Sequence, residues 1–406
     1  MRPKWYRTLD GDARRAFWTS FSGFSLDAMD IQLYSFVLPA LLAVWGLSHA
    51  EAGWLATVAL TSSAAGGWIA GLLADRFGRV RLLKITVLWF AIATCLCALA
   101  DNFEQLLIAR ALQGLGFGGE LAVGVVFVGE VARPDIRGRM VGMVQSGWAV
   151  GWGLAAAIAA VALSVLPPEL GWRATFIFGV LPAFAVYLFR RRLKESEVFR
   201  SSTRRSSWRA IFSGPIVGAT LRGSILASGM HGGYWAIATW WPAMLRAERG
   251  LSLTGSSPYL AALILGSFFG YVGGSWLSDQ AGRRVTLMGF AVSGIVLALT
   301  YAEFPLTGMS LLLFSAPLGF VATGMFSVVG PILTELFPTE LRGSGLGFCY
   351  NLGRGVAGVT PVLVGGNIER LGVGPAIGLY VACAYGFVLA AAVVLPETRG
   401  RTLLEV

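Results

Sequence analysis

The sequence predicts an all-α membrane protein whose twelve transmembrane helices form two six-helix bundles. Three observations support this prediction. Of the 406 residues, 55% are hydrophobic and only 13% are charged, whereas a soluble domain carries about 25% charged residues. Glycine, which is more frequent in membrane helices than in soluble ones, occurs 53 times. Finally, two polar motifs of the first half recur in the second half at an offset of about 204 residues.

Twelve stretches are long and apolar enough to cross a bilayer, which requires about 20 mostly apolar residues. The expected spans cover 16–44, 52–74, 82–100, 105–131, 140–166, 172–190, 222–245, 255–278, 285–303, 307–335, 343–368 and 373–395. Because span 1 is the least apolar and span 10 the longest, we expect both to be bent or unwound. The polar residues 1–15 lack the apolar region of a signal peptide, so span 1 is expected to serve as an uncleaved targeting segment.

Basic residues are unevenly distributed between the two sides of the predicted bundle. With the N-terminus in the cytoplasm, 26 of the 32 Lys and Arg residues fall on the cytoplasmic side and 4 on the outer side. Cytoplasmic loops of membrane proteins carry such an excess. We therefore expect both termini in the cytoplasm, in a membrane of the bacterial inner-membrane type. This topology also accounts for the net charge of +10 without a nucleic-acid partner.

The longest polar segment, residues 190–210, divides the chain into two parts of six spans each. It is strongly basic and reads RRRLKESEVFRSSTRRSSWRA. We expect a cytoplasmic linker between an N-terminal bundle, residues 1–189, and a C-terminal bundle, residues 211–406. Whether the linker lies on the membrane surface or is only a solvated tether stays open. Because one chain contains both bundles, we expect the protein to function as a monomer.

The recurring motifs lie in short loops at the predicted cytoplasmic ends of the spans. GLLADRFGR after span 2 is matched by SWLSDQAGR after span 8, and EVARPDIRG after span 4 is matched by ELFPTELRG after span 10. Gly78 permits a sharp turn, and charges around these turns can pair across helix ends. They are expected to latch the cytoplasmic side, with topology anchoring as the alternative. The expected latch residues are Asp75, Arg76, Gly78, Arg79, Glu130, Arg137, Asp279, Arg283, Glu335 and Arg342.

Three motifs carry a family resemblance. They are the G-x-x-x-D-R-x-G-R loop with its repeat, RALQGLGFGGE at Arg110–Glu120, and PETRG at Pro396–Gly400. They resemble, in that order, the signature loop of the major facilitator superfamily, a motif of its proton-coupled members and the terminal motif of its sugar porters. The resemblance covers nearly the whole chain. It implies a secondary transporter with its substrate site between two bundles.

Further segments resemble particular subgroups of that family. FSLDAMDIQLYSF at Phe24–Phe36 is similar to the D-x-x-D segment of aromatic-acid:proton and of sialate or monocarboxylate:proton symporters. TELFPTELRGSGLGF at Thr334–Phe348 and NLGR at Asn351–Arg354 resemble the same relatives. After span 6, where sugar porters have a P-E-S-P-R type of sequence, this chain has LKESEVF at Leu193–Phe199. The resemblance therefore favours organic acids over sugars.

Ionisable residues within the spans are the candidates for proton coupling. A charge near a helix centre costs roughly 2.5–3.5 kcal/mol, so such residues usually face a cavity and have a function. Asp27 and Asp30 share one helix face, and two carboxylates so close together repel, so at least one is expected to hold a proton. Glu120 and His231 are further candidates, since histidine titrates near neutral pH. A structural role remains the alternative for either aspartate and for His231.

Arg110 and Arg354 are the candidates for binding an anion. A guanidinium stays charged and can bind a carboxylate through two parallel hydrogen bonds. Asn351 lies one turn before Arg354. A structural ion pair is the alternative role for each arginine. Amide and aromatic side chains in the spans that usually face the cavity could complete the site, although most aromatic residues serve packing: Tyr34, Gln145, Trp148, Trp152, Tyr234, Trp235, Trp240 and Tyr350.

These residues predict proton-coupled uptake of a small organic anion by alternating access. PETRG leaves a sugar or polyol symporter open, and a drug:proton antiporter is a further alternative, although the arginines within the spans argue against lipophilic cations. The sequence has no H-E-x-x-H, Walker or G-x-S-x-G motif, and its four cysteines lack ligand spacing. We therefore expect neither an enzyme nor a sensor, no metal, and no cofactor beside the proton gradient.

Overall fold

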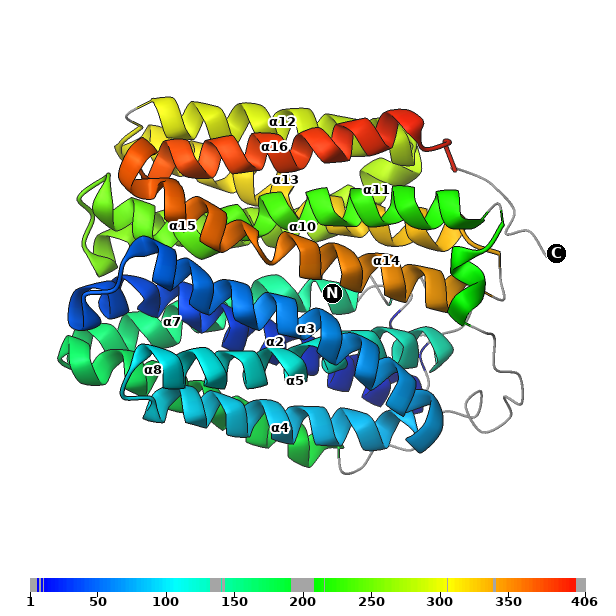
Figure 1. Cartoon of the computed structure of the whole chain (residues 1–406), viewed down its shortest axis with the longest axis horizontal. Helices are drawn as coiled ribbons and strands as arrows, with labels where there is room; N and C mark the ends of the chain where they lie inside the picture. The colour runs from blue at the N-terminus through cyan, green and yellow to red at the C-terminus, as the bar shows by residue number, and fades with distance from the viewer. Residues whose placement is uncertain are drawn as a thin grey trace.

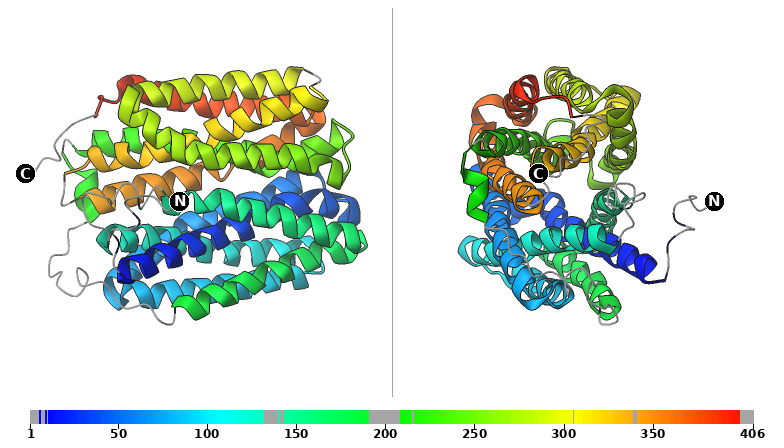
Figure 2. Two further views of the ribbon diagram at one scale, coloured as in Figure 1. Left: turned by 180° about the vertical axis from the view of Figure 1, so that it is seen from behind. Right: turned by 90° about the vertical axis from the view of Figure 1, so that its right-hand side faces the viewer.

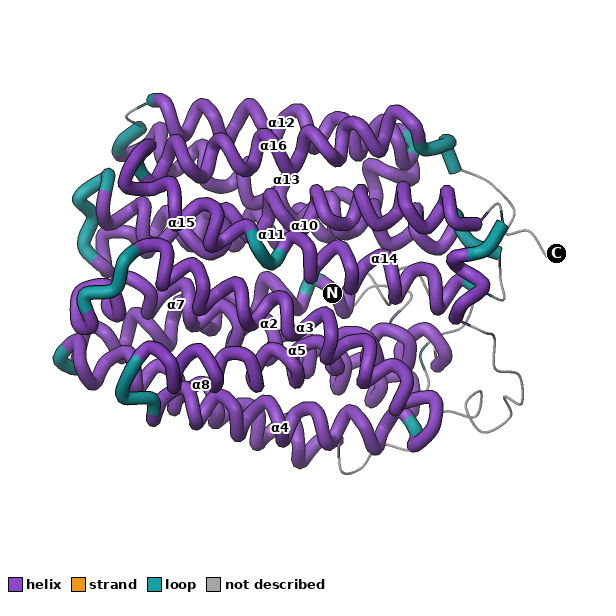
Figure 3. Tube along the Cα trace, in the orientation of Figure 1, coloured by secondary structure: helices purple, strands orange, loops and turns teal. Residues whose placement is uncertain are grey.

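The computed structural model describes residues 6, 9, 11–131, 140, 143–190, 208–214, 216–304, 306–338 and 341–398. Within these ranges the backbone alone is described for residues 12, 72, 75–76, 79, 119–131, 182–190, 208–209, 253–254 and 342–343. The described chain is almost entirely helical and contains no strand, as Figure 3 shows. The predicted all-α fold is confirmed.

Long helices account for twelve crossings of the bundle. The first half contains α2 (Gly11–Trp45), α3 (His49–Phe77), α4 (Arg79–Leu99), α5 (Phe103–Val131), α7 (Gly147–Val165) and α8 (Pro168–Arg190). A short 3-10 helix, η1 (Trp208–Phe212), precedes the second half. There follow α10 (Ile216–Ala247), α11 (Leu253–Ala281), α12 (Arg283–Glu303), α13 (Gly308–Glu335), α14 (Arg342–Ala357), α15 (Thr360–Leu371) and α16 (Val373–Val394). The predicted number of spans is confirmed, with α14 and α15 together forming the eleventh.

The two halves of the chain lie side by side with their helices roughly parallel (Figure 1). Within the first half, α3 packs on α5 and α2 packs on α7. Within the second half, α11 packs on α13 and α10 packs on α16. The halves meet where α3 contacts α14 and α15, and where α7 contacts α11. The end-on view in Figure 2 shows the same division.

The outward faces of the helices carry large apolar side chains. Ile108, Val161, Leu313 and Trp276 are each more than 60% exposed. Patches of this kind are rare on monomeric soluble proteins. Among the described residues, seven helices are long and apolar enough by composition to cross a membrane. These surfaces fit a protein surrounded by lipid.

The interruption of regular helix lies in span 11 and not in spans 1 or 10. Both α2 and α13 are continuous, although they contain Pro39, Pro317 and Pro331. By contrast, α14 ends at Ala357 and α15 begins at Thr360. Pro361 lies in the first turn of α15, where the missing N–H of proline is tolerated. In the interior of one continuous span-11 helix, the same proline would break or kink the helix. Spans 1 and 10 are therefore not unwound, which corrects that part of the expectation, and their bending stays a prediction.

The sequence repeat is also a repeat of helix packing. A Cβ atom added at Gly66 of α3 would come within 2.1 Å of the Leu115 carbonyl oxygen on α5. A Cβ atom added at Gly270 of α11 would come within 2.3 Å of the Phe320 carbonyl oxygen on α13. An equivalent second pair joins Gly114 to Ala59 and Gly319 to Leu263. Each half is thus built on two helices whose backbones touch, a close approach that small residues permit.

This packing predicts different effects for two glycines of the same helix. Gly66→Ala should destabilise the fold by about 1–3 kcal/mol, because the added methyl group must push the α5 backbone away. In Gly71→Ala the added Cβ meets no heavy atom within 4 Å, so alanine's higher helix propensity should leave stability equal or higher. Apparent melting temperatures of the two variants in detergent check this. A Gly66→Ala protein as stable as wild type would contradict the packing described.

Candidate functional site

Arg354 of α14 lies at the contact between the two halves and is only 1% exposed. Its Nη2 atom donates to the Ser63 carbonyl oxygen of α3 at 3.1 Å and to Asn351 Oδ1 at 2.7 Å. A Cβ atom at Gly118 would come within 1.8 Å of the same carbonyl oxygen, so a glycine there keeps a side chain away from it. The guanidinium also lies 4.8 Å from the centre of the Phe117 ring.

Two of the guanidinium nitrogens of Arg354 are not used in this arrangement. Nε and Nη1 are buried and have no hydrogen-bond partner among the described residues. Buried polar groups are normally paired, and a guanidinium is well suited to grip a carboxylate. The side chain can therefore bind an anion between the halves without first breaking any bond of these two nitrogens.

Arg110 is fixed more completely, and by its own half of the protein. Its Nε atom donates to the Leu55 carbonyl oxygen at 3.2 Å, and Nη1 donates to Gln113 Oε1 at 2.5 Å. The guanidinium also lies 4.5 Å from the centre of the Tyr34 ring. Gln113 is held in turn by a 2.9 Å hydrogen bond to Thr94 Oγ1. These contacts orient Arg110 toward the interior of the first bundle.

Asp27 and Asp30 each interact with a different arginine. Asp30 is fully buried, and neither carboxylate oxygen has a hydrogen-bond partner among the described residues. It interacts electrostatically with Arg110 without forming an ion pair within 4 Å. Asp27, also buried, interacts electrostatically with Arg354 of the second half. Asp30 is thus influenced by an arginine of its own half, and Asp27 by an arginine of the other half.

Aromatic side chains from both halves meet around Tyr234 of α10. The Tyr234 hydroxyl accepts a hydrogen bond from Trp148 Nε1 of α7 and lies 3.4 Å from Gln32 Nε2 of α2. The Trp235 ring lies 5.1 Å from the Tyr234 ring, and the Trp152 ring lies 6.0 Å from it. The core of the interface is therefore aromatic with a few polar atoms, as small-molecule sites require.

His231 lies one turn before Tyr234 on α10. Its ring is 4.7 Å from the ring of Tyr350 and 5.1 Å from that of Phe326. Neither ring nitrogen has a hydrogen-bond partner among the described residues.

A small cavity remains between the halves. It has room for about one water molecule, so an organic acid can enter only if the halves move apart. Its walls come from α2, α3, α5 and α10: Ile31, Tyr34, Ser35, Ala56, Leu60, Arg110, Trp235 and Thr239. The cavity brings together three of the residues singled out in the sequence, namely Tyr34, Arg110 and Trp235.

The other expected site residues do not all lie near the arginines and the cavity. Asn351 lies beside Arg354, as its spacing predicts. Gln145 is half-buried just before α7, and no polar contact connects it with the others. The side chain of Glu120 lies outside the described residues. Sequence reasoning missed Gln32 and Phe117; Gln32 could have been found as an amide in an apolar span two residues after Asp30.

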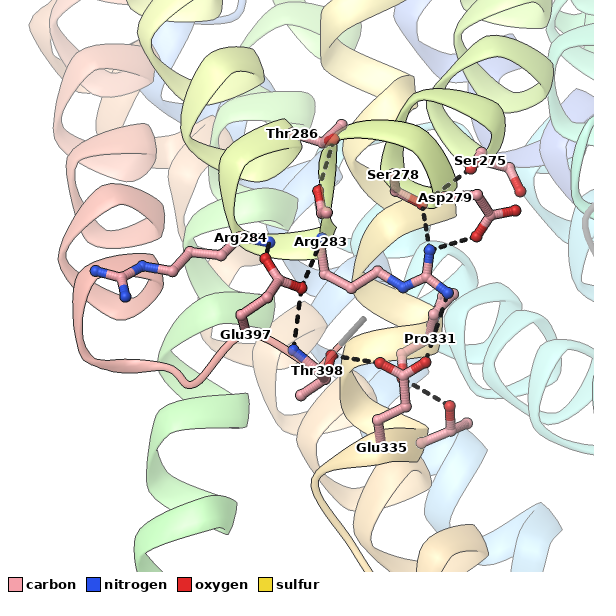
Figure 4. Close-up of polar contacts among 12 residues, drawn as sticks. Ser275, Ser278, Asp279, Arg283, Arg284, Thr286, Pro331, Glu335, Glu397 and Thr398 are labelled. Atoms are coloured by element: carbon pink, nitrogen blue, oxygen red, sulfur yellow. Dashed lines mark hydrogen bonds and ion pairs between the residues drawn. The ribbon is translucent and has the colours of Figure 1, made fainter. Parts of the chain in front are cut away.

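The expected cytoplasmic latch of the second half forms a polar cluster, drawn in Figure 4. The Arg283 side chain donates to the Asp279 carboxylate and to Ser278 Oγ, the latter at 3.1 Å. Its Nη2 atom lies 3.6 Å from Glu335 Oε1 of α13. These contacts join α11, α12 and α13, all within the second half.

Two residues of the terminal PETRG motif complete this cluster. The Glu397 carboxylate accepts from the backbone N–H groups of Arg283 at 3.0 Å and Arg284 at 3.1 Å, and so caps the start of α12. The Thr398 hydroxyl donates to Glu335. Neither residue was among those expected, although the motif that contains them was recognisable in the sequence.

In the first half, the structure describes only the glycine turn of the expected latch. Gly78 has a φ of 98° between α3 and α4, and Gly282 has a φ of 97° between α11 and α12. Glycine adopts such values at no steric cost. Arg137 lies outside the described residues, and so do the side chains of Asp75, Arg76, Arg79, Glu130 and Arg342. Within the described part of the chain, no three His, Cys, Asp or Glu side chains form a group that could hold a metal ion.

Comparison with known proteins shows similarity over nearly the whole chain. A probable 4-methylmuconolactone transporter of Cupriavidus pinatubonensis is 40% identical over 400 residues, which cover 98% of this chain and 93% of that protein. The niacin transporter NiaP of Acinetobacter baylyi is 29% identical and covers 86% of this chain and 85% of its own length. The cis,cis-muconate transport protein of the same organism is 28% identical, with 86% of each chain covered.

Solved structures and the family pattern agree with this similarity. The xylose transporter XylE from E. coli, in an inward-open conformation, superposes with a TM-score of 0.78 at 21% identity over 96% of this chain and 98% of that chain. At this identity the likeness concerns the fold. The sequence pattern of the Major Facilitator Superfamily matches residues 20–361. The chain is thus a transporter and not an enzyme, and it belongs to the Major Facilitator Superfamily.

Proposed function

We propose that this protein is a proton-coupled symporter that takes up a small organic anion by alternating access. The observation that carries the proposal is the buried guanidinium of Arg354 at the contact between the halves, two of whose nitrogens have no hydrogen-bond partner among the described residues. Relatives named for niacin and cis,cis-muconate support a carboxylate as the substrate. The fold alone would equally accommodate an uncharged substrate.

Binding of the substrate carboxylate at Arg354 would affect the contact between the halves. Arg354 holds α14 against α3 through the Ser63 carbonyl oxygen. A carboxylate makes stronger, charge-assisted hydrogen bonds to a guanidinium than a neutral carbonyl does. A substrate carboxylate that binds at Nε and Nη1 would attract the whole guanidinium and so draw it away from α3. Its arrival would then loosen the bond between Nη2 and Ser63 that holds the two halves together.

The proton would be carried by Asp30 or Asp27. Asp27 and the incoming carboxylate are both attracted by Arg354 and repel each other. Asp30 is buried beside Arg110, whose position is fixed, and has no hydrogen-bond partner among the described residues. Neutralising either carboxylate with a proton lowers the cost of bringing a second anion into the interior. The proton and the substrate would then move together.

Alternating access is supported by contacts between the halves at two levels of α3. Nearer the start of α3, the Val362 N–H of α15 lies 3.3 Å from Thr57 Oγ1. Nearer its end, the Trp68 ring lies 6.2 Å from the Phe348 ring of α14. A substrate would be admitted when one set of contacts opens and released when the other opens.

We place the transporter as a monomer in a bacterial inner membrane, with both termini in the cytoplasm. Residues 190–210 would link the two bundles, and the cytoplasmic loop charges would close the inner side. A sugar or polyol symporter is the second candidate, favoured by PETRG and by the fold shared with XylE.

Replacing Arg354 should abolish uptake of the acid. Arg354→Gln keeps a polar side chain, although a shorter one, and removes the charge, and each lost charge-assisted pair typically costs a binding site roughly tenfold or more. Uptake of a radiolabelled panel of organic acids and sugars into proteoliposomes with an inward proton gradient measures this. Arg370→Gln, at an exposed position near the end of α15, is the matched control and should behave like wild type. Accumulation of a sugar and of no acid would refute the anion proposal.

Replacing Asp30 should separate binding from proton coupling. Asp30→Asn mimics the protonated carboxyl, so exchange of labelled for unlabelled substrate should persist while proton-driven accumulation is lost. Comparing counterflow with accumulation in the same proteoliposomes makes the measurement. Asp101→Asn, at an exposed loop position paired with Arg173, serves as the control. If Asp30→Asn still accumulates substrate along a proton gradient, the proton is carried elsewhere.

A further inference from the structure

Three tryptophans beside Tyr234 supply indole N–H groups to the interface between the halves. Trp148 and Trp152 come from α7 of the first half, and Trp235 comes from α10 of the second. All three are less than 7% exposed. The indole nitrogen of tryptophan can only donate a hydrogen bond. A group of such donors in one place therefore demands acceptors.

The described structure satisfies only one of these donors. Trp148 Nε1 donates to the Tyr234 hydroxyl. Trp152 Nε1 and Trp235 Nε1 are buried and have no hydrogen-bond partner among the described residues. Leaving a buried donor unpaired is unfavourable, because the donor has lost its water and gained no partner. A ligand that supplies an acceptor oxygen would recover this cost.

The two tryptophans with unpaired donors pack on one side chain. The rings of both Trp152 and Trp235 contact the ring of Tyr234, at 6.0 and 5.1 Å between centres. Trp235 also lines the small cavity, together with Arg110 and Tyr34. Separation of the halves would widen the space beside Trp235. Among the described residues, the Tyr234 hydroxyl is the one acceptor that the three indole N–H groups reach.

Aromatic rings connect this group to Arg354. The Arg354 guanidinium lies over the ring of Phe117, and that ring is 5.8 Å from the ring of Trp148. A planar acid held by its carboxylate at Arg354 would lie along these rings. Its far end would then reach the indole donors.

We propose that Trp148, Trp152 and Trp235 form a second polar subsite, which binds an acceptor oxygen at the end of the substrate remote from its carboxylate. The inference rests on the proposed function, since Arg354 must hold the carboxylate. It narrows the substrate class to planar acids that carry a second oxygen, as a carbonyl or as a second carboxylate. An acid of the same shape without that oxygen leaves two buried donors unpaired and is disfavoured.

Uptake of three matched acids tests the subsite. Benzoate lacks the second oxygen, meta-acetylbenzoate adds a neutral carbonyl, and isophthalate adds a second carboxylate. In wild-type proteoliposomes with an inward proton gradient, kcat/KM for an oxygenated acid should exceed that for benzoate. In Trp152→Phe and Trp235→Phe, which keep an aromatic ring and lose the N–H group, this ratio should fall by roughly tenfold. The two oxygenated acids distinguish a carbonyl from a carboxylate as the preferred group.

Trp241→Phe is the control for these variants. Trp241 is also a buried tryptophan with an unpaired Nε1, but its ring packs on Tyr301, 4.0 Å away between centres. Trp241→Phe should leave unchanged the ratio of kcat/KM for an oxygenated acid to kcat/KM for benzoate. For a Phe variant that no longer transports, the shift in melting temperature caused by each acid gives the same comparison.

The outcomes separate the subsite from the function on which it rests. A ratio that stays at the wild-type value in both Trp152→Phe and Trp235→Phe overturns the subsite but leaves acid transport standing. A wild-type protein whose kcat/KM for benzoate equals that for the oxygenated acids also overturns the subsite and leaves acid transport standing. If none of the three acids accumulates in wild-type proteoliposomes, transport of aromatic acids fails, and the subsite fails with it.

Discussion

The cost of burying charge in a hydrocarbon surrounding is the constraint on which the interior of this protein depends. Each guanidinium is met by carbonyl, amide and aromatic groups from more than one helix: Arg110 by Leu55 and Tyr34, Arg354 by Ser63 and Phe117. The contacts of Arg354 also cross from one half to the other. The Arg354 bond to Ser63 therefore joins the halves through a polar contact. Under the proposed function a carboxylate would replace it, which apolar packing alone would not offer.

The packing within each half complements this exchangeable contact. Backbones of α3 and α5 touch at Gly66, and those of α11 and α13 touch at Gly270. Interfaces so close leave little room for adjustment, because interiors are packed to near crystalline density. Between the halves, contacts run partly through side chains such as Trp148 and Tyr234 and partly through close backbone approaches of α3 and α15 at Gly53 and Gly365. Rigid halves are what rocking of one bundle against the other requires.

Local signals allowed the number of spans and the glycine turns to be predicted, since both depend on a few neighbouring residues. The break in span 11 was missed although Pro361 is visible in the sequence, because Pro39 is tolerated within α2 and proline alone does not identify a break. Asn351 beside Arg354 followed from helical spacing. The Ser63 carbonyl and Phe117 could not be found in this way, because their roles depend on which faces of α3 and α5 meet α14.

The cap on α12 also has a consequence for biosynthesis. The first backbone N–H groups of that helix, at Arg283 and Arg284, are satisfied by Glu397, more than a hundred residues later in the chain. While the ribosome makes the intervening spans, the start of α12 must therefore rely on water or lipid headgroups for hydrogen bonds. The second half reaches its final arrangement only once the end of the chain has emerged. A nascent protein cut short before Glu397 would leave this helix end exposed, and quality control could recognise it there.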